Sequence, residues 1–345
     1  HVFPALAVAD VLRARGYMVT WIGTRQGLEA RVVPAAGIPM EWIDVGGVRG
    51  KGAGALLKTP LMLSRALLQA MAVFRRLKPA AALGMGGFAS GPGGVAARLT
   101  GCPLVVHEQN AVPGVTNRIL GRMSRHVLEG FPGSFSARRH ARYVGNPVRA
   151  AIAALPPPEK RFAGRSGARR LLVIGGSQGA RVLNLNAPAA VAGLEAGSVE
   201  VLHQTGVRDA EAVTTLYREH QVEARVTPFI DDMAAAYAWA DLAVCRSGAL
   251  TVAELSAVGL GALLVPFAAA VDDHQTKNAR FLVEQGAALL LAQSAATTEA
   301  LAGALRVLLQ DRERPLAMAR AARALARADA AELVADVCLK AGGLS

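Results

Sequence analysis

Short apolar runs that end in glycine-rich or polar turns alternate with helix-like stretches along the whole sequence. Runs such as "MVTWIG", "PLVVH", "RLLVIGG" and "DLAVC" have the length of buried strands, and a longer helix-like segment follows each of them. Strands that alternate with helices in this way favour a mostly parallel sheet covered by helices. The sequence therefore predicts an α/β fold.

The alternation occurs in two series, which suits a chain of 345 residues better than one domain does. The first series ends near "GNPVR", and residues 150–168 are rich in proline, glycine and charge, as linkers are. We expect a first domain at 1–149, a linker at 150–168 and a second domain at 169–320. The remaining stretch, which includes "AMARAARALARADAAELVADVCLKA", predicts one long helix that begins near Pro315.

Positive charge is concentrated in the first half of the chain. Residues 1–160 contain 20 Lys and Arg against 7 Asp and Glu, whereas residues 161–345 contain 18 against 19. A basic half indicates an anionic partner, either phospholipid or nucleic acid. Few aromatic residues lie among the basic ones and no nucleic-acid-binding motif is present, so we expect no nucleic acid partner.

The sequence opens with "HVFPALAVADVL", a histidine directly before a helical pattern. In a doubly wound fold the first strand and its glycine-rich turn precede such a helix, and that strand is usually central. We therefore expect both to lie ahead of His1, and we expect the chain as written to be unstable.

Two glycine-rich stretches follow predicted strands. "GMGGFASGPGG" spans residues 84–94, and "GGSQGA" spans residues 175–180. Glycine lets the backbone approach a ligand closely, and the N–H groups at a helix start favour anions. Neither stretch is the G-x-G-x-x-G dinucleotide fingerprint or a P-loop, so nicotinamide and ATP chemistry are disfavoured.

The stretch "CRSGALTVAEL", residues 245–255, indicates a nucleotide site. A turn follows the strand and a helix begins near Ala249, so the N–H groups of Ala249, Leu250 and Thr251 would face a pyrophosphate. Glu254 lies about 5 Å further along the helix axis. Its carboxylate could accept both ribose hydroxyls of a nucleotide there, and an exposed helix glutamate is the alternative.

Further polar clusters occur in three stretches. "DDHQTKNA", residues 272–279, suits sugar hydroxyls, although its side chains could also be helix caps. "HEQNAVPGVTNR" gathers polar side chains around a turn, and "GNPVR" ends in Arg149, which could reach a phosphate. No spacing of His, Cys or carboxylate residues matches a metal site, so we expect no metal and no cofactor.

These stretches resemble the MurG family of glycosyltransferases, family 28, in this order and over nearly the whole chain. The resemblance rests on "HVFPALAVA", "GMGGFASGPGG", "HEQN", "TNR", "GNPVR", "GGSQGA", "FIDDM", "CRSGALTVAEL" and "DDHQTKNA". It implies the GT-B architecture, in which two Rossmann-like doubly wound domains face a cleft and the final helix, residues 321–345, packs back toward the first domain. It also implies an inverting hexosyltransferase of peptidoglycan synthesis, which moves N-acetylglucosamine from UDP-GlcNAc to the 4-hydroxyl of the muramyl sugar of lipid I and gives lipid II.

The resemblance further implies which residues bind the substrates. The backbone of Ile230 would pair with uracil, Glu254 would hold the ribose, and Gln275 would bind the sugar hydroxyls. The residues expected to bind UDP-GlcNAc are Asn117, Arg149, Ser177, Ile230, Arg246, Ala249, Leu250, Thr251, Val252, Ala253, Glu254 and Gln275. Those expected to bind the acceptor are Gly86, Gly87, Glu108 and Asn110.

Inversion at the sugar C1 atom needs a base for the attacking hydroxyl and a field that stabilises the leaving diphosphate. His1 matches the last residue of the family's first glycine-rich turn, G-G-T-G-G-H, and it is the expected general base. Glu108 and His107 are the alternatives.

Because lipid I is a membrane lipid, the resemblance implies that the basic first domain docks on the anionic inner membrane surface, as a peripheral protein on its cytoplasmic side. Residues 56–78 form the expected interfacial segment, with an ordinary core helix as the alternative; its basic residues are Lys58, Arg65, Arg75, Arg76 and Lys78. The competing function is another GT-B UDP-sugar enzyme, such as a UDP-GlcNAc 2-epimerase.

Overall fold

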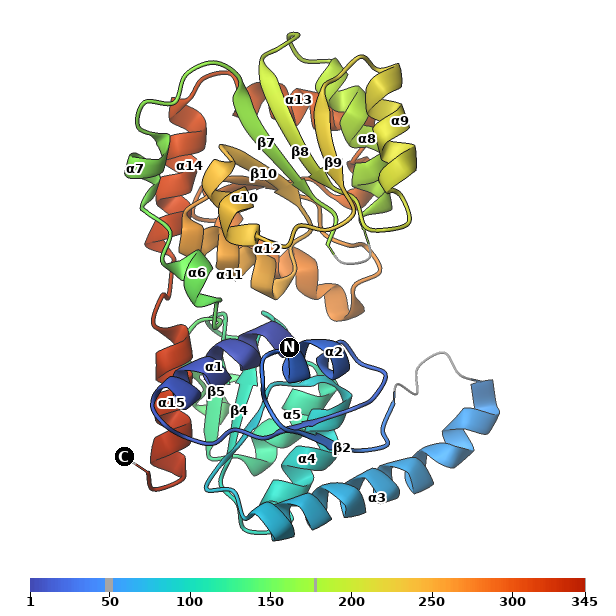
Figure 1. The fold of residues 1–345 in the computed structure, drawn as a ribbon, viewed down its shortest axis with the longest axis vertical. Helices are drawn as coiled ribbons and strands as arrows, with labels where there is room; N and C mark the ends of the chain where they lie inside the picture. Colours follow the sequence, from blue (N-terminus) through green and yellow to red (C-terminus); the bar gives the residue numbers. More distant parts are fainter. Residues whose placement is uncertain (47–51, 177–178, 345) are drawn as a thin grey trace. The chain divides into compact units, whose positions relative to one another are not determined.

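The computed structural model describes residues 1–46, 52–176 and 179–344, with the backbone alone for residues 52–58 and 271. The chain divides into two compact units (Figure 1). Unit 1 comprises His1–Arg149 and Asp329–Ser345, and unit 2 comprises Ala150–Ala328.

Unit 1 consists of short parallel strands and the helices between them. Its strands are β1 (Trp21–Gly23), β2 (Met40–Trp42), β3 (Ala82–Gly84), β4 (Leu104–Glu108), β5 (His126–Glu129) and β6 (Arg142–Tyr143). Its helices are α1 (Val2–Ala14), α2 (Glu29–Ala35), α3 (Gly52–Leu77), α4 (Gly87–Leu99), α5 (Val115–Met123), the 3-10 turn η1 (Ala137–Arg139) and α15 (Ala330–Ala341). β1 and β4 lie in the runs "MVTWIG" and "PLVVH", as predicted, whereas the short β6 carries no such run.

The doubly wound sheet expected for the first domain is present in unit 1 as two separately paired pieces. β1 pairs with β2, and β3, β4, β5 and β6 pair in that order, all in parallel. Within the described ranges β1 and β3 do not pair with each other. The carboxyl ends of β3, β4 and β5 therefore share one edge, and their first residues share the opposite edge.

The final helix α15 belongs to the core of unit 1. Val334 and Ala335 of α15 are buried with Val8 of α1, Val105 of β4 and Leu128 of β5. This contact with the sheet is visible in Figure 1, where α15 lies beside β4 and β5.

The long helix α3 has one buried and one exposed face. Ala66, Ala70 and Phe74 are buried, and α3 packs against α4. Leu61 and Leu68 are 76% and 66% exposed. None of the helices in the described ranges has both the length and the hydropathy that crossing a membrane requires.

Unit 2 has six parallel strands: β7 (Arg169–Ile174), β8 (Val199–Gln204), β9 (Ala224–Thr227), β10 (Leu242–Cys245), β11 (Ala262–Leu264) and β12 (Ala288–Leu290). Its helices are α6 (Ala150–Ala153), α7 (Pro158–Phe162), α8 (Arg181–Ala192), α9 (Ala210–Glu219), α10 (Met233–Trp239), α11 (Ala249–Val258), α12 (His274–Val283), α13 (Thr298–Leu308) and α14 (Glu313–Ala324), with the 3-10 turns η2 (Val271–Asp273) and η3 (Gln293–Ala295).

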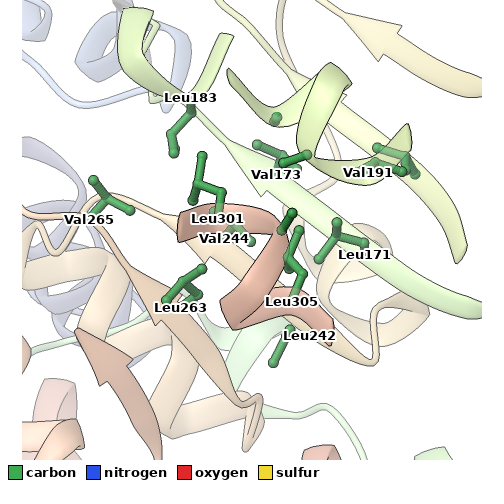
Figure 2. Close-up of a cluster of buried hydrophobic side chains, with 14 of the residues drawn as sticks. Leu171, Val173, Leu183, Val191, Leu242, Val244, Leu263, Val265, Leu301 and Leu305 are labelled. Carbon is green, nitrogen blue, oxygen red and sulfur yellow. The ribbon is translucent and has the colours of Figure 1, made fainter. Parts of the chain in front are cut away.

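The sheet of unit 2 is continuous, with the strand order β12–β11–β10–β7–β8–β9. Read from β9, this is the doubly wound order 3-2-1-4-5-6. Figure 2 shows how the central strands pack against α13: Val173 and Val244 of the sheet lie in one cluster with Leu301 and Leu305. The alternating pattern of the second half of the sequence predicts these strands, and the structure confirms them.

The segment 150–168, expected as a linker, contains the short helices α6 and α7. Its Arg161 is only 9% exposed and donates hydrogen bonds to the carbonyl oxygens of Val258, at 3.0 Å, and Gly259. These bonds fix α7 to the end of α11 within unit 2. The segment is rich in proline and charge, as predicted for a linker, but it packs against the rest of unit 2.

The prediction of one long C-terminal helix is wrong. α14 ends at Ala324 and α15 begins at Ala330. Met318 of α14 is buried in the core of unit 2, whereas Val334 of α15 is buried in unit 1. Helix propensity is a weak preference that tertiary packing overrides, and here the two halves of the stretch pack on different cores.

Candidate active site

Unit 2 has one place where its sheet is arranged to hold a ligand. The strand order reverses between β7 and β10, which pair with each other. In open α/β sheets, ligands bind outside the carboxyl ends of the strands at such a reversal. The glycine-rich stretch 175–180 follows β7 in the sequence, and the loop after β10 leads into α11. Two stretches identified from the sequence therefore flank this position.

The start of α11 presents backbone donors at this position. Gly248 is the N-cap residue, and no side chain caps the first turn. The N–H groups of Ala249, Leu250 and Thr251 have no partner within the helix, because the first turn of any helix lacks acceptors. An anion here would meet these donors and the positive end of the helix dipole.

The turn before α11 is fixed from beneath by α12. Ser247 is fully buried, and its hydroxyl donates to the backbone carbonyl of Gln275 at 2.8 Å. Asn278, also fully buried, donates to the carbonyl of Ser247 at 3.2 Å. The "DDHQTKNA" stretch therefore supports the anion-facing turn, a role that its sequence did not indicate.

Glu254 is buried, so the alternative of an exposed helix glutamate is wrong. Only 5% of Glu254 is exposed, and the hydroxyl of Tyr237 donates to its Oε2 atom at 3.0 Å. Val252 is buried in the core and Ala253 is half-buried. A buried carboxylate is costly unless it is hydrogen-bonded. Tyr237 holds the Glu254 carboxylate in a defined orientation one helical turn beyond the N–H groups.

The loop after β7 can be formed only with glycine at two positions. A Cβ atom on Gly179, where φ is +76°, would lie 2.3 Å from the carbonyl oxygen of Thr205. A Cβ atom on Gly175 would lie 2.7 Å from the backbone nitrogen of Ala180. Ser177 lies outside the described residues, so its contact with the diphosphate stays a prediction.

Gln204, at the end of β8, joins the loop after β7 to the loop after β9. Its side-chain oxygen accepts from the N–H of Gly176 at 2.9 Å, and its amide nitrogen donates to the carbonyls of Gly176 at 2.9 Å and Pro228 at 3.0 Å. Gln204 is 4% exposed. In the described part of the chain the backbone of Ile230, two residues beyond Pro228, makes no hydrogen bond. Its amide and carbonyl are therefore available to a planar base.

Arg246 and Gln275 lie at the carboxyl edge of the unit 2 sheet. Both side chains make hydrogen bonds to backbone groups there. Arg246 donates to the carbonyls of Val265 at 3.0 Å and Pro266 at 3.2 Å, and burial lowers the pKa of its guanidinium. The side-chain oxygen of Gln275 accepts from the N–H of Phe267 at 2.9 Å. These bonds orient both side chains next to the loop that follows β11.

In unit 1, His1 is held by a chain of hydrogen bonds. Its Nδ1 atom bonds to the side-chain oxygen of Gln109. The amide nitrogen of Gln109 bonds to His107 Nδ1 at 3.0 Å and donates to the His107 carbonyl at 2.8 Å. His107 Nε2 bonds to the carbonyl of Gly145 at 2.9 Å, which requires that this nitrogen carries the proton.

This series of hydrogen bonds fixes the tautomer of His1. Because the Gln109 amide nitrogen faces His107, its oxygen must face His1, and His1 Nδ1 must therefore carry the hydrogen. The lone pair of neutral His1 then lies on Nε2, and the side chain is exposed. His1 can accept a proton there, as a general base does.

The two alternative bases are engaged within the protein. His107 is fully buried, and burial lowers its pKa to about 4. Glu108 is 1% exposed, and both of its carboxylate oxygens accept hydrogen bonds. Its Oε1 atom accepts from the backbone N–H of Asn110 at 2.9 Å and from the side-chain amide of Asn110 at 3.2 Å. Its Oε2 atom accepts from the N–H of Gly114 at 3.1 Å and from the side-chain amide of Asn117 at 2.9 Å. The structure therefore favours His1 over both as the proton acceptor.

The loop after β3 lies against His1. A Cβ atom on Gly86, where φ is +91°, would lie 3.1 Å from His1 Cε1 and 3.2 Å from Asn117 Nδ2. Gly87, with φ +80°, begins α4. The predicted residues His1, Gly86, Gly87 and Asn117 are therefore brought together at the carboxyl edge of the unit 1 sheet.

Two buried side-chain oxygens in unit 1 lack partners in the described residues. Asn117 is 1% exposed and donates to the His107 carbonyl at 3.1 Å, but its Oδ1 atom accepts nothing. Asn146, 4% exposed, donates to the Gln109 carbonyl at 2.9 Å, and its Oδ1 atom is likewise unpaired. Buried acceptors are normally satisfied, so both atoms suit donors on a bound hydroxyl or amide.

Arg149 ends unit 1 with its guanidinium over the ring of Phe3, 5.5 Å from the ring centroid. A cation held over an aromatic face keeps a defined orientation. Its contact with the donor stays a prediction.

Four functional side chains have no role predicted from the sequence: Tyr237, Gln204, Gln109 and Asn146. Two of these side chains stand in motifs that the sequence singles out, Gln109 in "HEQN" and Asn146 in "GNPVR", which is a weak signal for a role. Tyr237 and Gln204 carry no local signal, since their roles follow from which side chains the fold places beside them.

Two models of glycosyltransferase family 28 match the chain. The family's N-terminal domain matches residues 1–129, and its C-terminal domain matches residues 170–334. Structures of low sequence identity share the fold: the UDP-GlcNAc 2-epimerase of Neisseria meningitidis is 10% identical, with a TM-score of 0.66 over 97% of this chain and 95% of that one.

Named relatives are much more similar in sequence. A protein of Xanthomonas axonopodis pv. citri named UDP-N-acetylglucosamine–N-acetylmuramyl-(pentapeptide) pyrophosphoryl-undecaprenol N-acetylglucosamine transferase is 54% identical over 99% of this chain and 80% of its own length. A protein of the same name from Methylococcus capsulatus is 53% identical over 99% of this chain and 96% of its own length.

A solved structure agrees with these relatives. The MurG of Acinetobacter baumannii is 40% identical, and its crystal structure superposes with a TM-score of 0.86 over 99% of this chain and 96% of that one. The two-domain α/β fold is therefore the GT-B fold. The chain belongs to glycosyltransferase family 28, among the relatives of MurG.

Proposed function

We propose that the protein transfers N-acetylglucosamine from UDP-GlcNAc to the 4-hydroxyl of the muramyl sugar of lipid I, with inversion at C1, and produces lipid II. One observation carries the proposal. A helix start with uncapped N–H groups lies where the sheet of unit 2 reverses, and the buried Glu254, held by Tyr237, lies one turn beyond it. The names of the relatives describe those proteins as N-acetylglucosamine transferases that act on UDP-N-acetylglucosamine and N-acetylmuramyl-(pentapeptide) pyrophosphoryl-undecaprenol.

In this proposal the donor lies along the carboxyl edge of unit 2. The diphosphate accepts hydrogen bonds from Ala249, Leu250 and Thr251, and the carboxylate of Glu254 accepts the two ribose hydroxyls. The free amide and carbonyl of Ile230 pair with uracil. Gln275, whose oxygen is taken by Phe267, donates through its amide nitrogen to a sugar hydroxyl.

The acceptor hydroxyl is activated from unit 1. Neutral His1 takes the proton of the 4-hydroxyl on Nε2 while the oxygen attacks C1 and the bond from C1 to the UDP oxygen breaks. A positioned base contributes about 10²- to 10⁴-fold to such a step. Charge develops on the leaving diphosphate, and the dipole and N–H groups at the start of α11 stabilise it. Gly86, Gly87, Glu108 and Asn110 form the acceptor side, and the contact of Asn117 with the donor stays a prediction.

A two-armed assay tests the reaction. Labelled UDP-GlcNAc incubated with the protein and lipid I is expected to give a labelled lipid product. UDP-GlcNAc incubated alone is expected to stay unchanged. Conversion of UDP-GlcNAc to its C2 epimer without lipid I would instead support the epimerase alternative, and no turnover in either arm would contradict the proposal.

We also propose that the protein docks on the anionic inner membrane surface through α3. Leu61, Arg65, Leu68 and Arg75 repeat at helical spacing and are all exposed, so they share one face. Arg65 and Arg76 pair with Asp44, at 3.1 Å, and Glu41, at 2.6 Å. Lys58 has no described side chain and stays a prediction. Exposed leucines beside arginines suit a bilayer of anionic lipids.

Vesicle binding tests this docking. Leu61→Ser/Leu68→Ser and Arg75→Glu/Lys78→Glu are each expected to weaken binding to vesicles that contain phosphatidylglycerol by at least tenfold. Arg208→Glu/Arg218→Glu, exposed in unit 2, is the charge-matched control. Binding that both α3 variants leave unchanged would rule out this face.

A further inference from the structure

A cationic pocket lies in unit 1, at the edge of the sheet opposite to the candidate active site. Its volume is about 190 Å³, and Val127, Leu128 and Val337 form its apolar part. Its polar side chains come from three separate segments and are Arg125, His126, His140, Arg142 and Lys340.

The fold explains why these side chains meet. His126 is the first residue of β5 and Arg142 the first residue of β6, and the two strands are parallel neighbours. Both residues therefore lie at the starts of the strands, whereas Glu108 lies at the carboxyl end of β4. Lys340 extends from the last turn of α15, which packs on β5.

His140 is held in an uncommon backbone conformation at this pocket. It follows η1 with φ +48° and ψ 38°, in the left-handed region that few residues other than glycine adopt. Such conformations persist where the surrounding structure requires them. His140 and Arg142 both line the pocket.

The pocket carries positive charge that no acidic side chain balances. No Asp or Glu lines it, and within the described ranges Arg125, Arg142 and Lys340 make no ion pair. In the same unit Arg15 pairs with Asp336 at 2.5 Å. Lys340 lies in the last turn of α15, where its charge offsets the negative end of the helix dipole. Like charges that converge without a partner repel, so a bound anion would stabilise this arrangement.

We propose that the pocket binds a phosphate group. Guanidinium groups bind phosphate oxygens bidentately, and a lysine adds a point charge. The volume of about 190 Å³ is below the 300–1,000 Å³ of sites for drug-sized ligands, which suits a phosphate group. The bound group would join α15 to β5 and β6, because Lys340 and Arg142 bind it from the two sides. Its source is inorganic phosphate or a phospholipid headgroup.

Calorimetric titration of the full chain with inorganic phosphate tests the first source. Arg125→Gln/Arg142→Gln is expected to weaken binding at least tenfold. The control is Arg98→Gln/Arg138→Gln, which changes two exposed arginines of unit 1 outside the pocket. Without phosphate neither variant should unfold at a lower temperature than the wild type, since none of the four arginines is in the core.

Vesicle binding tests the second source with the same three proteins. Loss of phosphate binding in the pocket variant alone supports a free anion. No phosphate binding, with weaker binding of the pocket variant alone to phosphatidylglycerol vesicles, supports a headgroup. The proposal is overturned when the pocket variant and the control behave alike in both titrations.

Discussion

Gln109 determines which nitrogen of His1 can accept a proton. The amide cannot turn over without losing its bonds to His107, so its oxygen stays directed at His1 Nδ1. His107 stays neutral because burial lowers its pKa to about 4, and it does not compete for the proton at neutral pH. Gln109 is in this account a positioning residue that keeps the lone pair of His1 on Nε2.

Replacing the base and its positioning residue should lower turnover to different extents. His1→Asn is expected to lower kcat about a hundredfold or more, because it removes general base catalysis. Gln109→Leu is expected to lower kcat about tenfold, because both tautomers of His1 then become accessible. The KM for UDP-GlcNAc should stay within about twofold in both, since neither residue contacts the donor in the proposal.

Steady-state kinetics over a range of pH provide the measurement. His1→Asn should remove the acid limb of the kcat profile, and Gln109→Leu should keep that limb. Gln26→Leu, at an exposed glutamine of unit 1, is the control. A wild-type acid limb in His1→Asn would exclude His1 as the base.

At the residue scale the sequence predicted the charged and glycine residues and missed their partners. Glu254 lies in a motif whose spacing indicates a nucleotide site, whereas the role of His1 was predicted from the resemblance to the family. Tyr237 binds Glu254 from α10, 17 positions earlier in the chain, and no pattern around Tyr237 distinguishes it from a core tyrosine. Such partners follow from packing, which local sequence does not encode.

At the scale of the elements, Gln204 connects the two loops that contact opposite ends of the proposed nucleotide. One amide bonds to Gly176 after β7 and to Pro228 after β9. Neither loop has a regular secondary structure to hold it beside the other. If the donor binds as proposed, we expect the positions of the diphosphate and the uracil to depend on this one buried side chain at the end of β8.

Gln204→Leu should therefore weaken donor binding. The variant keeps the volume approximately and removes three hydrogen bonds, so the backbone groups of Gly176 and Pro228 lose their partners. We expect the KM for UDP-GlcNAc to rise about tenfold, the effect of roughly 1.4 kcal/mol. The Kd for UDP should rise in parallel, and kcat should change less.

Gln285→Leu, at an exposed glutamine of unit 2, is the matched control for this variant. Equal KM values for Gln204→Leu and the wild type would show that the two loops hold their positions independently.

At the scale of the whole molecule, each unit contains a fully buried histidine. His107 in unit 1 and His203 in unit 2 are both 0% exposed, and burial lowers their pKa values to about 4 and about 3. His203 bonds to Tyr217 at 3.0 Å and to Asn184 at 3.2 Å. Both histidines are neutral in the folded protein at pH values where they become charged in the unfolded chain.

Acidification should therefore destabilise the protein. Between pH 6.5 and about 4 the unfolded state binds protons at these two histidines and the folded state does not. The free energy of unfolding should fall by up to about 1.4 kcal/mol per pH unit for each histidine as the pH is lowered through this window. Urea unfolding at pH 7.5, 6.5, 5.5 and 4.5 measures it.

His203→Gln should reduce this pH dependence, and His220→Gln, at an exposed position, should leave it unchanged. A free energy of unfolding that stays constant from pH 7.5 to 4.5 would contradict the account.

The two α/β series could be predicted from the sequence. The C-terminal stretch could not, because α14 belongs to unit 2 and α15 to unit 1. The alanine-rich stretch from residue 315 has high helix propensity throughout, so no local feature marks the end of α14 at Ala324. The break follows from the separate cores in which Met318 and Val334 are buried. Which core a helix joins is a tertiary property, and the sequence pattern alone does not show it.

The central claim is that the start of α11 binds a diphosphate while Glu254 holds the ribose. Calorimetric titration with UDP tests it most directly. The wild type should bind UDP, and Glu254→Gln should weaken binding by about 2 kcal/mol, roughly thirtyfold, because charge-assisted bonds to two hydroxyls are lost. Glu284→Gln, at an exposed glutamate, should bind as the wild type does. Absence of UDP binding, or equal affinity in Glu254→Gln and the wild type, would contradict the claim.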